Sequence, residues 1–162
     1  MSLYTLNNII PLKDISSSLL KKVSLATNIA EKSDFNSSKR LGATLGIKGI
    51  VFHASNNHRT RVGKTPCISL HAEVNVILKA LKTYEKNPTL KTKKQLPPST
   101  LCVVRLMTEK SGLPKHRTYR FGISKPCINC QKQLYKFNVT RVFYTDVINN
   151  QEVICEMRIN KI

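Results

Sequence analysis

Two short motifs, 56 positions apart from His71 to Cys127 (127 − 71), constrain this chain more than any other feature. They are H-A-E at residues 71–73 and P-C-I-N-C at residues 126–130. Together they supply one imidazole, two thiolates and one carboxylate. A catalytic zinc ion is held by three protein ligands and keeps its fourth position open, whereas a structural zinc ion is closed by four. The motifs therefore predict one Zn²⁺ per chain, bound by His71, Cys127 and Cys130, with Glu73 left free of the metal.

The chain is strongly basic. Its 162 residues include 27 lysines and arginines against 9 aspartates and glutamates, which gives a formal net charge of +18. A field of this sign attracts polyanions and phosphorylated small molecules; a basic surface that only keeps the protein in solution is the alternative. The hydrophobic content of 41% is enough for the core of one domain. We expect a single domain over residues 1–162, with basic insertions at about 85–99 and 108–125.

The sequence shows none of the segments that direct a chain into a membrane. No apolar run approaches the roughly 20 residues that a spanning helix needs, and the first residues do not form a basic segment followed by an apolar one. Five cysteines, two of them in a metal-like pair, suit a reducing compartment better than a disulfide scaffold. We expect a soluble intracellular protein of the cytoplasm or nucleus that does not bind membranes. Whether copies assemble into a homo-oligomer stays open.

The spacing of the apolar residues predicts alternating helices and strands. In order, we expect a helix that is capped by Asp14 or the serines after it and ends near 36–38, strands at 41–47 and 50–54, and a polar loop at 55–66. A helix from 71 follows, with Ser69 as its cap. Next we expect a lysine-rich connector at 82–98, a strand at 101–107, a basic loop at 108–125 with a short extra strand around Tyr119 and Phe121, a helix with Pro126 in its first turn, and strands at 140–145 and 153–159.

These helices restrict where a metal can lie. His71 and Glu73 are two positions apart and do not share a helix face, so both can address one metal only at the start of their helix. Cys127, Cys130 and Leu134 fall on one stripe of the later helix, which places the face that carries both thiols inward.

The joint occurrence of H-x-E and P-C-x-x-C, in this order and each at a helix start, resembles the zinc-dependent cytidine/deoxycytidylate deaminase superfamily. The resemblance extends to the order of helices and strands along the whole chain. It implies an α/β fold of three layers, α/β/α, around a five-stranded mixed sheet. It also implies that His71, Cys127 and Cys130 are the zinc ligands and that Glu73 is the proton shuttle.

The resemblance also implies an asparagine, just past the second strand, that contacts the sugar or base of the substrate. Asn57 is the first choice and Asn56 is its rival; Arg59, Arg61 and Ala72 complete the predicted substrate-binding set. Two basic loops lead into the two motifs, one with Arg59, Arg61 and Lys64, the other with Lys115, Arg117, Arg120 and Lys125. Because arginine and lysine bind phosphate oxygens, we expect these loops to favour a phosphorylated substrate.

Two features leave the branch of the superfamily open. The interval between His71 and Cys127 is long, with the excess in the two basic insertions. A histidine ligand resembles the deoxycytidylate and polynucleotide branch. A short hairpin at Asn149-Asn150 instead leaves no room for a crossover helix, so the fifth strand is expected to be antiparallel, as in the free-nucleoside branch.

The chemistry of these residues predicts hydrolytic deamination. Zinc lowers the pKa of a bound water towards neutrality, and Glu73 can move protons from that water to the ring nitrogen and the departing amine. The favoured function is a cytosine deaminase that acts on a (deoxy)nucleotide. The alternatives are an editor of cytosine or adenine in DNA, RNA or tRNA, which the net charge favours, and a zinc-stabilised nucleic-acid-binding module without turnover. The expected partner is a nucleotide or a nucleic acid.

For the remaining histidines and cysteines, and for two aromatic residues, a structural role or plain solvent exposure is weighed against a functional one. His53 lies in a strand pattern and is expected to be packed or at the surface, and Cys102 and Cys155 are expected to be small core residues. His58 and His116 lie in basic loops, where phosphate contact and plain solvent exposure are equally compatible with the sequence. Tyr119 and Phe121 could stack on a base, but core packing is the preferred interpretation.

Overall fold

The computed structural model describes residues 2–33, 40–56, 71–86, 97–107 and 119–160, together with the backbone of 61–62 and 65–66. The helical elements are η1 (Leu12–Asp14), α1 (Ser17–Glu31), α2 (Ala72–Lys86) and α3 (Ile128–Lys136). The strands are β1 (Tyr4–Pro11), β2 (Arg40–Ile47), β3 (Ile50–Ser55), β4 (Arg61–Val62), β5 (Thr65–Pro66), β6 (Ser99–Met107), β7 (Arg120–Gly122), β8 (Val139–Ile148) and β9 (Gln151–Ile159). None of the described helices combines the length and the apolar character needed to cross a membrane.

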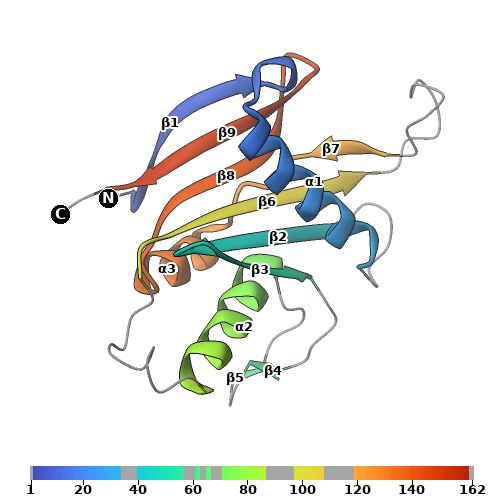
Figure 1. The fold of residues 1–162 in the computed structure, drawn as a ribbon. Coiled ribbons are helices and arrows are strands. Elements are labelled where there is room, and N and C mark those ends of the chain that lie inside the picture. Colours follow the sequence, from blue (N-terminus) through green and yellow to red (C-terminus); the bar gives the residue numbers. More distant parts are fainter. Residues whose placement is uncertain are drawn as a thin grey trace.

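One mixed sheet lies between helices on both faces, which confirms the predicted three layers (Figure 1). Its strand order is β1-β9-β8-β6-β2-β3, and β7 pairs with the end of β6. β6 and β8 run parallel, and the other neighbouring pairs are antiparallel. The prediction of five strands is wrong, because the described sheet has seven. β7 falls where the sequence predicts a short extra strand, whereas β1 falls where it predicts none. The small β4–β5 pair lies within and at the edge of the predicted loop.

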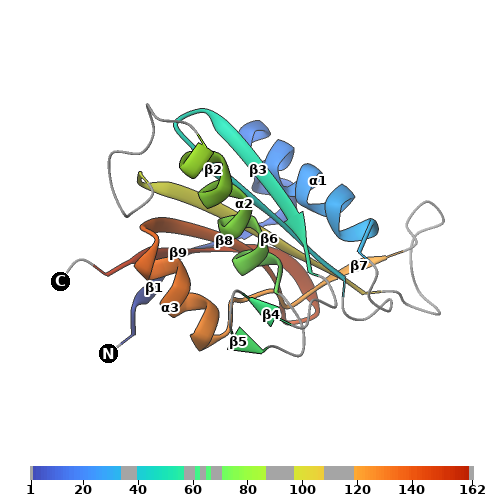
Figure 2. The same ribbon diagram turned by 90° about the horizontal axis from the view of Figure 1, so that it is seen from below.

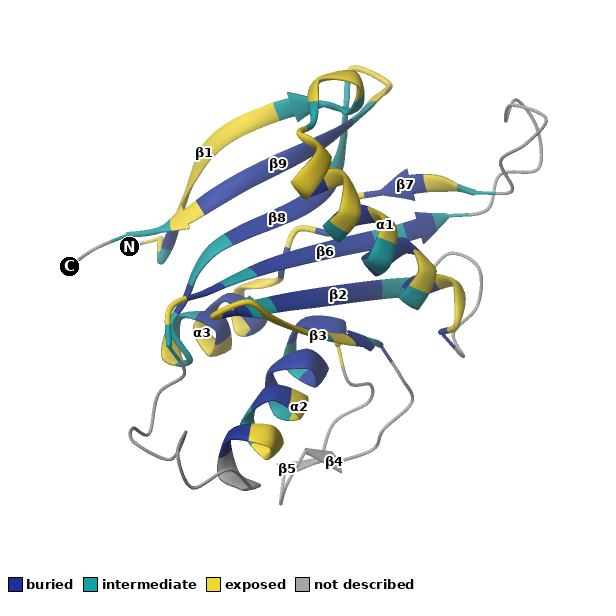
Figure 3. Ribbon diagram, in the orientation of Figure 1, coloured by how far each residue is buried: buried dark blue, intermediate teal, exposed yellow. Residues whose placement is uncertain are grey.

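β1 escapes prediction because little in its own sequence specifies a strand. Of its eight residues only Tyr4 is buried, and most of the others are exposed (Figure 3). A register shift between Leu6 and Asn8 breaks the alternation of the two faces. The asparagines in its middle also disfavour strands. β1 is therefore specified by its pairing with β9, at the other end of the sequence.

α1 covers one face of the sheet and begins where the serines predict. The Ser16 hydroxyl accepts a hydrogen bond from the Leu19 backbone N–H at 3.2 Å, which caps the helix. The buried stripe of α1 packs on side chains of β6 and β8. β2 also approaches it closely, because a Cβ on Gly42 would lie 2.0 Å from the carbonyl oxygen of Ala26. The absent side chain at Gly42 is thus a condition for seating α1.

α1 ends at Glu31, short of the predicted end near 36–38. The backbone N–H groups of Lys32 and Ser33 donate to carbonyls three residues back, at 3.2 and 3.1 Å, which tightens the last turn. The Ser33 hydroxyl then donates to Asn56 Oδ1 at 2.8 Å. This bond draws the chain towards the end of β3 and away from the helix axis. Residues 34–39 lie outside the described part.

α2 and α3 lie together on the opposite face of the sheet (Figure 2). α2 continues to Lys86 and so enters the segment predicted as a connector at 82–98. The reason is Tyr84, which is buried in the core between α2 and the sheet and extends the apolar face of the helix by another turn. Residues 87–96 lie outside the described part.

β8 and β9 form the hairpin predicted at Asn149-Asn150. Both asparagines have positive φ angles, 51° and 61°, which are typical of the two-residue turn whose twist matches antiparallel strands. The predicted antiparallel last strand is therefore confirmed as β9.

Candidate metal centre and active site

His71 stands directly before α2. Its backbone carbonyl accepts the N–H of Asn75 at 2.9 Å, so His71 occupies the cap position of the helix. The side-chain amide of Asn75 donates to the carbonyl of Ser55 at 2.8 Å and ties the first turn of α2 to the end of β3. The prediction of Ser69 as the cap is therefore wrong, because the helix begins only at Ala72; Ser69 itself lies outside the described part. His71 and Glu73 thus lie at the helix start, as their spacing requires.

Cys127 and Cys130 hold the corresponding place at α3. Cys127 is the N-cap residue: its Sγ accepts the N–H of Cys130 at 3.5 Å, and its carbonyl accepts that of Gln131 at 2.8 Å. Pro126 therefore precedes the cap instead of lying in the first helical turn, because the helix begins at Ile128. The carbonyl of Pro126 accepts the side-chain amide of Gln131 at 2.8 Å, which fixes the approach to the helix.

Ser124 and Thr145 anchor the segment that leads to Cys127. β8 pairs with β6 as far as Val103, and beyond that residue β7 takes its place beside β6. The two buried hydroxyls lie 2.8 Å apart at this branch. Ser124 also donates to the carbonyl of Val103 at 2.8 Å, and Thr145 to that of Gly122 at 2.7 Å. Sequence analysis does not single out either residue, because isolated hydroxyls in strand patterns carry no recognisable signal.

The three predicted metal ligands converge at these helix starts. His71 Nδ1 lies 3.2 Å from Cys130 Sγ and 3.9 Å from Cys127 Sγ, and the ligand atoms of all three residues lie within 4.8 Å of one another. Ligand atoms of a tetrahedral zinc ion are about 3.5–3.8 Å apart, given Zn–S and Zn–N bonds of about 2.3 and 2.0 Å. The group can therefore hold a metal ion such as zinc.

Glu73, the second residue of α2, is only 3% exposed. Its Oε2 atom is buried and has no hydrogen-bond partner among the described residues. Burial raises the pKa of Glu73, and the hydrogen bond from its own backbone and the charge of His71 lower it by less. An unpartnered buried polar atom costs stability and calls for an explanation such as a bound water or a catalytic role.

The surroundings of the cysteines disfavour the thiolate form that binds metals. Burial raises the pKa of the Cys130 thiol, and the charges of Glu73 and Cys127 raise it further. A divalent cation reverses this effect because it stabilises thiolates directly. A zinc ion at the three ligands, with a water or substrate beside Glu73, would supply what both the thiols and the carboxyl oxygen lack. The donor set therefore fits zinc.

Asn56 is locked into the fold. It is 6% exposed, and its Oδ1 accepts the N–H of Leu41 at 2.9 Å and the hydroxyl of Ser33 at 2.8 Å. It thereby joins the end of α1 to the ends of β2 and β3. This role in the fold was not foreseen, and the substrate role of Asn56 stays a prediction.

The other predicted substrate-binding residues are described only in part. Ala72 is fully buried as the first residue of α2. Arg61 is described only through its backbone in β4, while Arg120 and Lys125 are exposed. The predictions that fall outside the described residues concern Asn57, His58, Arg59, Lys64, Lys115, His116 and Arg117.

The surface and core positions that the sequence predicts for His53, Cys102, Cys155 and Phe121 agree with the structure. His53 is exposed on β3, and its carbonyl accepts the ammonium of Lys79 at 3.1 Å. Cys102 and Cys155 are core residues, each 1% exposed. Phe121 packs in the core beneath α1.

Comparison with known proteins adds a likeness in fold. No protein-family model and no curated protein matches the sequence. The structure is similar to the crystal structure of a cytidine deaminase from Burkholderia pseudomallei, with a TM-score of 0.52 and 16% sequence identity, over 86% of this chain and 91% of that chain. At this identity the likeness establishes a cytidine-deaminase-like fold.

Proposed function

We propose that this protein is a zinc-dependent hydrolase that removes the amino group of a nucleobase as ammonia, with cytosine in a (deoxy)nucleotide as its substrate. The observation that carries the proposal is the buried Oε2 of Glu73, which has no hydrogen-bond partner in the part of the chain that the structure describes and lies beside three converging metal ligands. A carboxylate held in this way is suited to exchange protons with a molecule that enters the site. The likeness in fold to a cytidine deaminase supports the choice of reaction.

The reaction consumes one water molecule for each ammonia that it releases. The water oxygen bonds to the ring carbon that carries the amino group, and Glu73 transfers one water proton to the adjacent ring nitrogen. Glu73 then transfers the remaining hydroxyl proton to the amino group. The C–N bond breaks, ammonia leaves, and the carbon–oxygen double bond forms. Because burial raises the pKa of Glu73, its carboxyl is better suited to return each proton than an exposed glutamate is.

The chain's other residues hold these groups in place. His71, Cys127 and Cys130 would bind the zinc ion, and the start of α3 favours the charge of the two thiolates. When bound, zinc supplies the Lewis acidity that lowers the pKa of the attacking water.

We also propose that Asn57 contacts the sugar or base and that basic side chains select a phosphorylated substrate. Oδ1 of Asn56 already accepts two hydrogen bonds from the fold, which favours Asn57 over Asn56 for this role. Lys125 is exposed and directly precedes the P-C-x-x-C motif. Each charge-assisted bond to phosphate is worth roughly 1.5–3 kcal/mol, or about tenfold or more in preference.

Ammonia release tests the proposal. We would compare kcat/KM for cytidine, cytidine and deoxycytidine monophosphates, adenosine, and a short cytosine-containing strand at two salt concentrations, with Glu73→Gln as the background. We expect the monophosphates to exceed cytidine by about tenfold or more. Equal values for cytidine and its monophosphates would contradict the phosphate preference. No ammonia from any substrate, with zinc present in the protein, would contradict the proposed reaction.

The net charge of +18 favours a second candidate function, the deamination of bases within a polynucleotide. Each neutralised phosphate releases counterions, so binding of a strand would weaken steeply with salt. A higher kcat/KM for the strand than for the monophosphates, with a steep loss at the higher salt concentration, would replace the nucleotide by the polymer as the substrate.

A further inference from the structure

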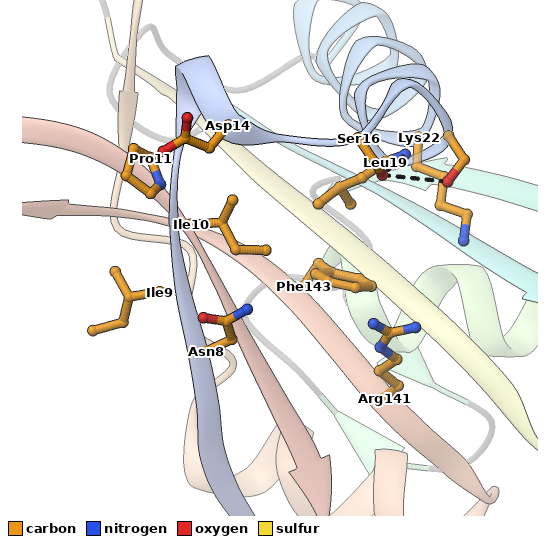
Figure 4. A pocket seen from close by; sticks show the side chains of 11 residues that line it. Asn8, Ile9, Ile10, Pro11, Asp14, Ser16, Leu19, Lys22, Arg141 and Phe143 are labelled. Atoms are coloured by element: carbon orange, nitrogen blue, oxygen red, sulfur yellow. Dashed lines mark hydrogen bonds between the residues drawn. The ribbon is translucent and has the colours of Figure 1, made fainter.

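A groove of about 480 Å³ lies on the face of the sheet opposite the metal ligands. It is bounded by the end of β1, the first turns of α1, and β8 (Figure 4). Phe143 in its lining belongs to the core beneath α1, whereas α2 packs on the other face of the sheet. The volume lies within the usual range for small-molecule sites, about 300–1,000 Å³. The groove is thus separate from the candidate active site.

Arg141 is held rigidly in this groove. Its guanidinium lies 4.6 Å from the ring centroid of Phe143, a cation–π contact. Its Nε donates to Oε2 of Glu156 at 2.6 Å, and its Nη2 forms an ion pair with the same oxygen. Glu156 is 2% exposed and also receives hydrogen bonds from Asn7 and Arg158, so its position is fixed as well. These contacts occupy one side of the guanidinium. Among the described residues Nη1 has no hydrogen-bond or ion-pair partner, which leaves it for a ligand.

Lys22 of α1 supplies a second cation. Its side chain extends from the helix into the groove towards Arg141 (Figure 4). Among the described residues it makes no ion pair. Arg141, Arg158 and Lys22 together oppose the single carboxylate of Glu156, while Asp14 lies at the far end of the groove (Figure 4). The end of the groove near Arg141 therefore has an excess of positive charge.

The rest of the groove is partly apolar. Ile10, Leu19 and Phe143 line it, and Leu19 and Phe143 are buried. A ligand that fits both parts has an anionic group with several acceptor oxygens at one end and an apolar or ring-shaped body at the other. Inorganic ions lack the body, and a plain apolar molecule lacks the charge.

We propose that this groove binds a small organic phosphate, with its phosphate group between Lys22 and Arg141 and its organic part against Phe143. An arginine whose fork is fixed in advance binds phosphate oxygens at a lower entropic cost than a free one. The proposal does not rest on the deaminase function, because its residues lie on the other face of the sheet.

NMR titration of the zinc-loaded protein tests this site. Phenyl phosphate and phenol share a ring and differ in the phosphate, and inorganic phosphate lacks the ring. We expect saturable shifts of the backbone amides of Lys22 and Phe143 with phenyl phosphate, weaker binding of inorganic phosphate, and no saturation with phenol. Failure of phenyl phosphate to saturate these amides at millimolar concentration would overturn the proposal. Shifts centred on the metal ligands instead would also overturn it.

Matched variants locate the charge. Lys22→Gln is expected to weaken phenyl phosphate binding by about tenfold or more. Arg141→Lys keeps a charge beside Glu156 but loses the fork, and is expected to have a similar effect. The control is Lys21→Gln, which removes the same charge from an exposed neighbour that does not line the groove; it should leave the affinity within about twofold. If the Lys21 and Lys22 variants weaken phenyl phosphate binding equally, the affinity depends only on the overall charge of the protein, which would contradict the site. Saturation by a short single strand but not by phenyl phosphate would assign the groove to nucleic acid and contradict the proposal.

Discussion

Two buried glutamates, on opposite faces of the sheet, have opposite surroundings. Glu73 is 3% exposed, and its Oε2 has no partner among the described residues. Glu156 is 2% exposed and receives hydrogen bonds from Asn7 and two arginines. Burial raises the pKa of both carboxyls. At Glu156 the hydrogen bonds outweigh burial and lower the pKa overall, whereas at Glu73 the pKa stays raised.

The difference in hydrogen-bond partners means that Glu156 stabilises the fold, whereas Glu73 lowers its stability. A buried carboxylate with several charged partners can contribute to stability, whereas one without partners lowers it. An unpartnered group that lies among potential metal ligands is therefore a candidate for chemistry. Each face of the sheet holds one of these two glutamates, and substitutions on each face can test the difference.

The largest effect is expected on removal of the metal ligands of α3. The double substitution Cys127→Ser with Cys130→Ser should abolish both zinc binding and turnover, because one histidine remains of three ligands. Elemental analysis of protein purified without chelators measures the metal, which we expect at about one ion per chain in the unaltered protein. Cys102→Ala, a buried cysteine on the α1 face, is the control and should retain zinc. Stoichiometric zinc in the double variant would refute the assignment.

Substitution of Glu73 by glutamine should come next in size. We expect kcat to fall by roughly 10²–10⁴-fold, because the amide cannot exchange protons. Zinc content should stay the same. The free energy of unfolding should stay the same or rise, since a buried carboxylate with an oxygen that lacks a partner among the described residues is removed. Steady-state kinetics and urea denaturation measure the two effects, and Glu31→Gln at the exposed end of α1 is the control. A near-native rate in Glu73→Gln would break the contrast between the two glutamates.

Glu156→Gln should show the reverse behaviour. We expect the free energy of unfolding to fall by about 1–3 kcal/mol, through loss of charge-assisted hydrogen bonds. The side chains of Arg141 and Arg158 are 43% and 57% exposed, so they regain water and the loss stays moderate. Urea denaturation measures the change, and kcat of the folded enzyme should be unaffected. An unchanged stability would show that this buried carboxylate is no better placed than Glu73.

The smallest effect concerns pH. The pKa of Glu156 is lowered from 4.5 on folding, so its contribution to stability is fully present above pH 4.5 and is lost as the pH falls through the folded pKa. The difference in stability between the unaltered protein and Glu156→Gln should therefore be constant above pH 4.5 and shrink below it. Urea denaturation over a pH series measures this difference. A difference that grows on acidification has the wrong sign and would contradict the assigned environment.

The parts of the fold that the sequence predicts are those with local signals. Apolar residues that alternate or follow one another locate β2, β3, β6, β8 and β9. The serines after Asp14 mark the start of α1, and Asn149-Asn150 marks the last hairpin. The spacing of His71 and Glu73 correctly requires a helix start, and the structure brings His71 together with both cysteines. These features depend on neighbours within a few positions in the sequence.

What could not be predicted depends on distant contacts. β1 is specified by β9, the early end of α1 by a hydrogen bond to Asn56, and the length of α2 by the burial of Tyr84. The branch between β6 and β8, held by Ser124 and Thr145, likewise joins residues from separate strands. Glu156 gives no signal in the sequence, because its partners come from β1, β8 and its own strand.

The branch at Ser124 has a consequence for how this protein can diversify. Met107 and Arg120 are paired across β6 and β7, so the chain between them leaves and re-enters the sheet at one place. Lengthening a loop with fixed ends costs little, about 0.6 kcal/mol for each doubling. Hydroxyl bonds on the far side of β7 meanwhile keep the approach to Cys127 constant. The position of the segment that leads to Cys127 is therefore set by this branch, and the length of chain that joins Met107 to Arg120 can change without moving the two thiols.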